Sequence, residues 1–261
     1  MKKILMSVLV LGVLVLGVTM VVAIQTSTFL QTTGDASSVL STLHETSGDY
    51  SARLHAWNPS AGNEGRVRIE LPNGFTLNDL KNIAWQQYVE QGYVSHLDVK
   101  IDVDNNGVED DALVFEYAKV NPADCDDTTD YPLDAQINTF GDKGIISNSS
   151  WAWLSSGPAG GCASLATEFF WHSLASWKDG PISSEANGKT INGNTKVIAL
   201  EFEVDAWIVE SESFIDDLNL NDVVIEDFEG SQGAEGSIAA DMTFLANPNP
   251  LSFGSLLPGQ S

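Results

Sequence analysis

The sequence has 261 residues, of which 43% are hydrophobic, enough for one large all-β domain or two small domains with a sizeable core. It holds 36 acidic residues against 12 lysines and arginines, and its formal net charge is −24. A surface this acidic repels nucleic acid and anionic lipid headgroups, so binding to nucleic acid is excluded. The same surface suits cations or salty surroundings.

The N-terminus begins with Lys2 and Lys3, followed by the uncharged apolar run 4–23. This order is typical of a signal peptide, cleaved after Ala23, within residues 1–23. The run is also about long enough to remain as a membrane anchor helix, which needs roughly 20 apolar residues. Both alternatives place the rest of the chain outside the cytoplasm, secreted or anchored at the cell surface. The protein then contacts a membrane only through residues 4–23, if these are not cleaved.

Residues 24–45 are rich in Thr and Ser and are expected to form a stalk or an edge strand. Over residues 46–229, polar and apolar side chains alternate in short segments such as "SARLHAW", "GRVRIEL", "SHLDVKIDVD" and "KVIALEFEV", separated by Gly, Asn and Pro turns. A period of two is typical of strands with one packed face and one wet face. The pattern therefore predicts an all-β domain, an antiparallel β-sandwich of the jelly-roll type.

One later segment, "ASLATEFFWHSLASWK", has apolar residues at helical intervals and predicts a single short helix. Its aromatic side chains are expected in the core, and His172 is expected to be an ordinary surface histidine. Residues 230–240 form a Gly-rich linker, followed by the strand-like tail 241–261. This tail is too short to fold alone, so we expect it to add a strand to a sheet edge of its own sandwich or of a neighbouring subunit.

Two cysteines, Cys125 and Cys162, lie in the exported part of the chain. A single pair of cysteines in an exported protein usually forms a disulfide, so we expect these two to be bonded. Metal binding by these cysteines is not indicated, because neither has a second cysteine at close spacing.

The stretch "DVDNNGVEDD" concentrates five acidic side chains around one glycine, and their repulsion would be relieved by a cation. In the spacing of a Ca²⁺ loop, Gly107 falls where a sharp turn needs it, and Leu113 stands where the usual bidentate Glu would be. Glu109, Asp111 or another loop would then complete the shell. The alternative is a hairpin tip of solvated Asp and Asn, which favour turns. The predicted calcium ligands, at positions 1, 3, 5, 7 and 9, are Asp102, Asp104, Asn106, Val108 and Asp110.

The segment "LEFEVDAW" places three carboxylates and one indole ring on a single strand face: Glu201, Glu203, Asp205 and Trp207. Alternate strand residues lie roughly 6.5–7 Å apart, between the spacings of retaining and inverting glycosidases. Three interpretations stay open. The face is simply solvated, or it binds a glycan with Trp207 as a stacking platform, or two of its carboxylates are catalytic.

The run from "SGDYSARLHA" through "GYVSHLDVKIDVDNNGVEDDALVFEY" to "FIDDLNLNDVVIEDFE" resembles the concanavalin-like and carbohydrate-binding-module jelly rolls of exported surface proteins. The acidic turn resembles, in its first half, the Ca²⁺ turns of dockerin and thrombospondin type 3 repeats. The resemblance implies a β-sandwich, often with a structural Ca²⁺ and often with glycan contact.

We therefore expect an extracytoplasmic, Ca²⁺-binding β-sandwich that serves as an adhesion or glycan-binding module. One alternative is a structural subunit of a surface layer or filament that pairs with a neighbouring subunit by strand donation. The other is a polysaccharide hydrolase or lyase. The sequence assigns no catalytic residue.

Overall fold

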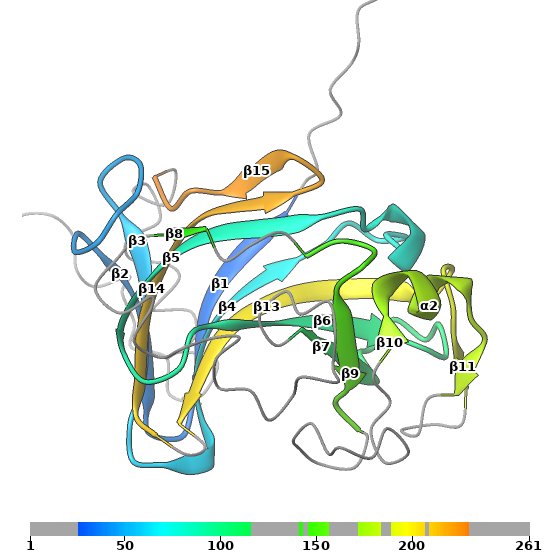
Figure 1. The fold of residues 1–261 in the computed structure, drawn as a ribbon, viewed down its shortest axis with the longest axis horizontal. Coiled ribbons are helices and arrows are strands. Elements are labelled where there is room, and N and C mark those ends of the chain that lie inside the picture. Colours follow the sequence, from blue (N-terminus) through cyan, green and yellow to red (C-terminus); the bar gives the residue numbers. More distant parts are fainter. Residues whose placement is uncertain are drawn as a thin grey trace, which may run out of the picture.

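The computed structural model describes residues 26–115, 141–142, 146–156, 172–183, 189–206 and 209–229, and within them the chain is built mainly of β-strands (Figure 1). Several sequence predictions lie outside these residues and stay predictions: the N-terminal apolar run, the Cys125–Cys162 disulfide, the linker and the C-terminal tail. Among the described residues, no helix has the length and apolar composition needed to cross a bilayer.

The described strands form two large antiparallel sheets. Sheet A has the strand order β1-β4-β13-β6-β7-β9-β10, and sheet B has the order β2-β3-β14-β5-β8, with β15 paired to β14. The strands of sheet A are β1 (Ser27–Thr33), β4 (Ser60–Glu70), β13 (Lys196–Ala206), β6 (His96–Asp102), β7 (Asp111–Phe115), β9 (Trp151–Leu154) and β10 (His172–Ser173). The strands of sheet B are β2 (Ala36–Ser41), β3 (Ser51–Ala56), β14 (Ser211–Leu220), β5 (Ile83–Gln91), β8 (Gly141–Asp142) and β15 (Val223–Glu226).

The chain crosses repeatedly from one sheet to the other. The strands β1 and β2 join different sheets, as do β3 and β4, β4 and β5, β5 and β6, and β13 and β14. Residues 24–45 were expected to form a stalk or an edge strand. They contain β1, at the edge of sheet A, and β2, at the edge of sheet B. The described residues confirm the predicted antiparallel β-sandwich, and the repeated crossing is the connectivity of a jelly roll.

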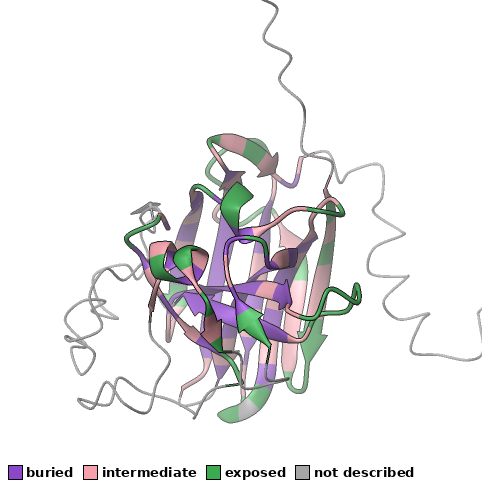
Figure 2. Ribbon diagram, turned by 90° about the vertical axis from the view of Figure 1, so that its right-hand side faces the viewer, coloured by how far each residue is buried: buried purple, intermediate pink, exposed green. Residues whose placement is uncertain are grey.

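The core lies between the two sheets and is filled by the apolar side chains that point inward from the alternating strands. Figure 2 shows buried residues along the middle of the strands and exposed residues mainly at loops and strand ends. Each fully buried aliphatic or aromatic side chain contributes roughly 1.5–3 kcal/mol. Trp85 packs edge-on against Phe202 with ring centroids 5.1 Å apart. The inward residues include Leu54, Val67, Ile69, Trp85, Leu97, Val99, Ile101, Leu200, Phe202 and Ile215.

The segment predicted to be helical is described only from residue 172 onward. Among the described residues of that segment only α2 (Leu174–Asp179) is helical, and it begins after Ser173, whose hydroxyl accepts a hydrogen bond from the Ser176 amide. Leu174 and Trp177 are buried, as expected for core residues. His172 belongs to strand β10 and meets the Trp177 ring edge-on at 5.0 Å. Two short elements complete the fold: η1 (Leu77–Asp79) and the β11 (Ile182–Ser183)–β12 (Thr190–Ile191) ribbon.

Candidate functional site

The acidic turn, residues 102–110, connects β6 to β7 in sheet A. It brings one carboxylate oxygen each from Asp102, Asp104 and Asp110 within 4.8 Å of one another. Asp102 is buried at the end of β6, Asp110 is half-buried and Asp104 is exposed. Three of the predicted calcium ligands are therefore neighbours in space, in an arrangement of oxygens that suits a hard cation.

Backbone amides hold these carboxylates in place. Asp102 accepts hydrogen bonds from the amides of Asn106 and Gly107, at 3.1 and 2.8 Å. Asp110 accepts from the amides of Val103 and Asp104, at 2.7 and 3.1 Å. Gly107 has a φ of 88°, a left-handed conformation that glycine adopts without strain. The backbone amides therefore stabilise part of the negative charge of Asp102 and Asp110. This geometry fits both a solvated hairpin tip and a cation site.

The residues that were expected to complete the shell are engaged elsewhere. Glu109 forms an ion pair with Arg68 at 2.8 Å, and Asp111 accepts hydrogen bonds from the hydroxyl and amide of Ser156, at 2.6 and 3.0 Å. The side-chain oxygen of Asn106 accepts the Val108 amide at 2.7 Å. A cation at this turn would therefore take its protein carboxylates from positions 1, 3 and 9 and fill its remaining positions with backbone oxygen or water.

The carboxylates of β13 lie on the face of sheet A that points away from the core, and two of them, Glu201 and Glu203, are buried. Strand register places Glu201 opposite Arg68 on β4 and opposite Asp98 on β6. Glu203 is likewise opposite Arg66 and His96. We call this surface the ionic face and define it by Arg66, Arg68, His96, Asp98, Lys100, Glu201 and Glu203.

Ion pairs tie the ionic face together across three strands. Glu201 is 1% exposed and binds Arg68 at 2.6 Å and Lys100 at 2.9 Å. Glu203 is 7% exposed, and its Oε1 lies 2.9 Å from Nε2 of His96. The expectation of a wet face was therefore wrong for these two residues. The physical reason is that β4 and β6 supply cations directly beside the carboxylates of β13.

The pKa values of two buried carboxyl groups, Asp98 and Glu203, shift in opposite directions from their ordinary values. Burial raises the pKa of Asp98 to about 7, and the Glu203 carboxylate adds to the rise. Burial also acts to raise the pKa of Glu203, but the hydrogen bond to His96 and the charge of Arg66 outweigh it and lower this pKa. Because the two carboxyl groups interact this closely, they titrate as a pair rather than independently.

Of the other two predicted ligand-binding residues, only Asp205 lies within the described chain. Asp205 is half-buried and stands at a register shift between β13 and β4. Trp207 lies outside the described residues. Since Glu201 and Glu203 are engaged by cations, the acidic ladder itself offers little free hydrogen-bonding surface to a sugar.

A second surface, on sheet B, combines rings with charged groups. We call it the aromatic face and define it by His44, Arg53, His55, Trp57, Tyr88 and Phe214. Phe214 of β14 stands between Arg53 on β3 and Tyr88 on β5 in the strand register. The His44 ring stacks on Tyr88 at 3.7 Å, and the Arg53 guanidinium lies 6.0 Å from the Phe214 centroid. The His55 and Trp57 rings lie 5.0 Å apart.

Carboxylates border these rings. Arg53 pairs with Glu212 at 2.5 Å, His55 with Glu210 at 2.8 Å and His44 with Glu90 at 3.3 Å. The alternation in "SARLHAW" puts Arg53, His55 and Trp57 on one strand face, but this pattern alone did not predict a site there. The alternation in "QQYVEQ", which puts Tyr88 and Glu90 on one face, was an available signal. The pairing of β3, β14 and β5, which joins these residues, depends on segments far apart in the chain.

No protein-family model matches this sequence, and no curated protein matches it. Similar solved structures include a family 11 carbohydrate-binding module from Clostridium thermocellum in complex with a β-1,3-1,4-mixed-linked tetrasaccharide. Its TM-score is 0.41 at 6% identity, covering 75% of this chain and 87% of that chain. A family 11 module of a cellulosomal cellulase from the same organism has a TM-score of 0.41 at 7% identity, covering 75% and 86%. Similarity at this TM-score and identity does not assign a function to this chain.

Proposed function

We propose that this chain is a carbohydrate-binding β-sandwich module that works outside the cytoplasm and binds Ca²⁺ at its acidic turn. The observation that carries the proposal is the aromatic face, where rings and ion-paired polar groups share one sheet surface. A pyranose ring has an apolar face that packs on aromatic rings and hydroxyl groups that need planar hydrogen-bonding partners. His44, Tyr88 and Trp57 supply rings, and the exposed side chains of Arg53, Glu90 and Glu210, unlike the buried Glu201 and Glu203, can still offer donors and acceptors to a sugar.

The calcium part of the proposal is supported by the convergence of Asp102, Asp104 and Asp110 within 4.8 Å. The extracytoplasmic location is supported by the lysine-led apolar run at the N-terminus. A module that is displayed outside the cell meets millimolar Ca²⁺ in many environments, so even a weak affinity of about 10⁻⁴ to 10⁻³ M would keep the turn occupied.

The hydrolase alternative fits the described site less well. A pair of catalytic carboxyl groups must flank a bound sugar. Glu201 and Glu203 instead are 1% and 7% exposed and are held by cations from two neighbouring strands. We therefore assign them to the ionic face and place carbohydrate binding on the other sheet.

Retention on a panel of immobilised polysaccharides (β-glucans, xylan, mannan and chitin), in the presence of Ca²⁺, tests the proposal. We expect the full chain to bind at least one of them, and Tyr88→Ala and Trp57→Ala each to weaken binding about tenfold, because the second removes a ring and the first removes the ring on which His44 is stacked. The matched control is Phe29→Ala, since Phe29 is an exposed aromatic residue, 36% exposed, on β1 of sheet A.

Binding by the wild type that is unchanged in Phe29→Ala and lost in the two other variants supports the aromatic face. The proposal is wrong if no polysaccharide is retained. It is also wrong if Phe29→Ala weakens retention as much as Tyr88→Ala does, because aromatic exposure alone would then account for retention.

A further inference from the structure

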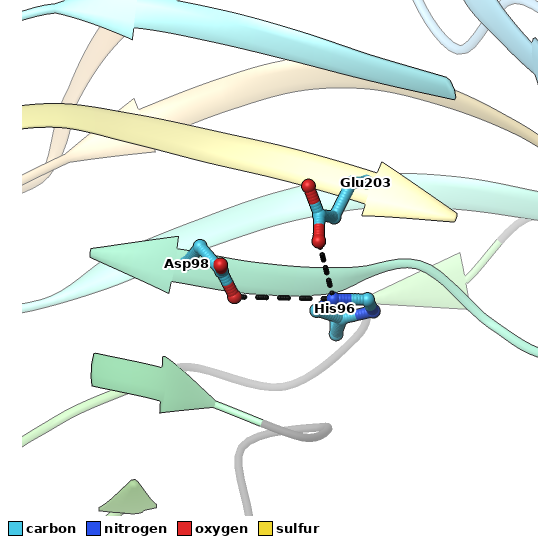
Figure 3. Close-up of side chains that lie close together, drawn as sticks. All are labelled: His96, Asp98 and Glu203. Atoms are coloured by element: carbon cyan, nitrogen blue, oxygen red, sulfur yellow. Dashed lines mark hydrogen bonds and ion pairs between the residues drawn. The ribbon is translucent and has the colours of Figure 1, made fainter. Parts of the chain in front are cut away.

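We propose that His96, Asp98 and Glu203 bind a divalent transition-metal ion of the Zn²⁺ class on the ionic face of sheet A. His96 and Asp98 are alternate residues of β6, and Glu203 comes from the neighbouring strand β13 (Figure 3). Their ligand atoms lie within 4.8 Å of one another, and all three residues are buried. This site is independent of the carbohydrate and calcium proposals, since it uses none of their residues.

The distances suit a small tetrahedral site. Zn²⁺ bonds of 2.0–2.1 Å place two ligand atoms of a tetrahedron about 3.3–3.4 Å apart. Nε2 of His96 lies 2.9 Å from Glu203 Oε1 and 3.9 Å from Asp98 Oδ1, so the two measured separations fall on either side of that value. Shifts of about half an ångström would bring both to it. Three protein ligands then leave the fourth position for water.

A second observation points to a missing partner at the same place. Oδ1 of Asp98 and Oε2 of Glu203 are buried oxygens that accept no hydrogen bond. Buried carboxylate oxygens without a partner are costly, because burial removes their hydration without replacing it. Asp98 is 5% exposed, and its other oxygen is held by Lys100 at 3.0 Å, which leaves Oδ1 directed toward His96. A cation bound between His96 and Asp98 would satisfy Oδ1 of Asp98, whereas Oε2 of Glu203 lies 3.8 Å from Nε of Arg66.

The local charge is also suited to a cation. Lys100 and Arg66 face the site from β6 and β4, and Glu201 faces Lys100 from β13. Glu64 and Asp205 add negative charge close to Glu203. The carboxylates near His96 therefore outnumber the cations, and a divalent ion would reduce their mutual repulsion.

The ligand chemistry separates this site from the acidic turn. One imidazole nitrogen and two carboxylates are a set that Zn²⁺ and its first-row neighbours accept, whereas Ca²⁺ takes oxygen ligands in greater number. The two sites can thus be filled by different ions in the same solution. This difference allows one to be tested while the other is held saturated.

Calorimetric titration of Zn²⁺ into the full chain, in excess Ca²⁺, tests the inference. We expect one Zn²⁺ per chain and a Tm that rises by about 5 °C over Ca²⁺ alone. Co²⁺ in place of Zn²⁺ should give the visible absorption of a tetrahedral site with nitrogen and oxygen ligands. His96→Gln and Glu203→Gln should each weaken Zn²⁺ binding by at least about tenfold and remove the Tm rise.

His55→Gln is the matched control. His55 also lies beside two carboxylates, but it meets Glu210 through Nε2 at 2.8 Å and Glu212 through Nδ1 at 3.9 Å. One ion cannot use two nitrogens on opposite sides of a ring, so His55→Gln should bind Zn²⁺ like the wild type. If His96→Gln does not fold, Glu203→Gln decides, because Gln keeps the size of Glu. Absence of Zn²⁺ binding in the wild type, unchanged binding in Glu203→Gln, or equal loss in His55→Gln would overturn the proposal.

Discussion

The acidic turn and the ionic face both gather carboxylates on sheet A, but they balance the charge in different ways. In the turn, Asp102 and Asp110 accept hydrogen bonds from backbone amides no more than seven residues away. On the ionic face, Glu201 meets Lys100 and Arg68, which are 101 and 133 residues away (201 − 100 and 201 − 68). The turn is local and largely exposed, whereas the face is assembled by strand pairing and is buried.

This difference separates the effects that a lost carboxylate should have in the two regions. A turn that holds its carboxylates with amides keeps their charge available to a cation from solution. On the ionic face, arginine and lysine neutralise Glu201, so its charge is used within the fold. Loss of one partner on the face then leaves another charge buried and unpaired, which is much more costly than losing the same contact at the surface.

The largest expected effect is that of Glu201→Gln. The change keeps the size of the side chain but removes the buried charge that Arg68 and Lys100 share, so two half-buried cations lose their common partner. We expect the free energy of unfolding to fall by about 3–5 kcal/mol, measured by urea denaturation. Glu70→Gln is the control, because Glu70 pairs with the same Arg68 at 2.7 Å but its side chain is 41% exposed.

Glu70→Gln should cost about 1 kcal/mol or less, as exposed ion pairs do. Equal losses in Glu201→Gln and Glu70→Gln would contradict the distinction between the buried Glu201 and the exposed Glu70. They would show that burial of Glu201 does not strengthen its dependence on the cations.

The sequence predicted the local features and missed the pairing. Alternation correctly placed Val67, Ile69, Leu97, Val99 and Ile101 in the core, because side-chain direction along one strand depends only on that strand. The same alternation could not say what lies opposite an outward residue. That depends on which strands are neighbours and in which register, and it is set by segments far apart in the chain.

The same contrast between local sequence and strand pairing explains which parts of the candidate sites were predicted. Asp102, Asp104 and Asp110 were found from spacing alone, because all three lie in one turn. Glu201 and Glu203 were placed with Asp205 and Trp207 on one strand face, but the burial of the two glutamates was not foreseen, since Arg66 and Arg68 come from β4. The aromatic face was missed for the same reason, because its rings come from strands that only the fold brings together.

Asp102→Ala should have the next largest effect, and it should appear without any metal. The change removes the acceptor for the Asn106 and Gly107 amides, so we expect a loss of about 1–3 kcal/mol in chelator. Asp104→Ala is the comparison, because exposed Asp104 accepts only the Asn106 amide, which Asp102 also binds. Its cost in chelator should be within about 0.5 kcal/mol. Equal costs in chelator would contradict the unequal roles of the two carboxylates.

Calcium should then distinguish the contribution of these carboxylates to backbone hydrogen bonding from their contribution to metal binding. With an affinity of about 10⁻⁴ to 10⁻³ M, ~10 mM Ca²⁺ should stabilise the wild type by about 1.4–2.7 kcal/mol relative to chelator. Asp104→Ala should lose most of this gain while it keeps the stability of the metal-free protein, because it removes a ligand and little else. Thermal melts with chelator and with Ca²⁺ measure both quantities. Identical wild-type melts in the two conditions would mean that the turn is a solvated hairpin tip.

The smallest expected effect is at Glu109, where the two regions meet. Arg68 contacts Glu109 of the turn at 2.8 Å and Glu201 of the ionic face at 2.6 Å, but the Glu109 side chain is 42% exposed. Glu109→Gln should therefore cost about 0.2–1 kcal/mol at low salt. At about 1 M salt the Debye length falls to about 3 Å, so this cost should vanish while that of Glu201→Gln persists. Urea titrations at both salt concentrations measure the difference. A cost for Glu109→Gln that salt does not reduce would mean that Glu109 belongs energetically to the ionic face, and the boundary drawn here at Arg68 would be wrong.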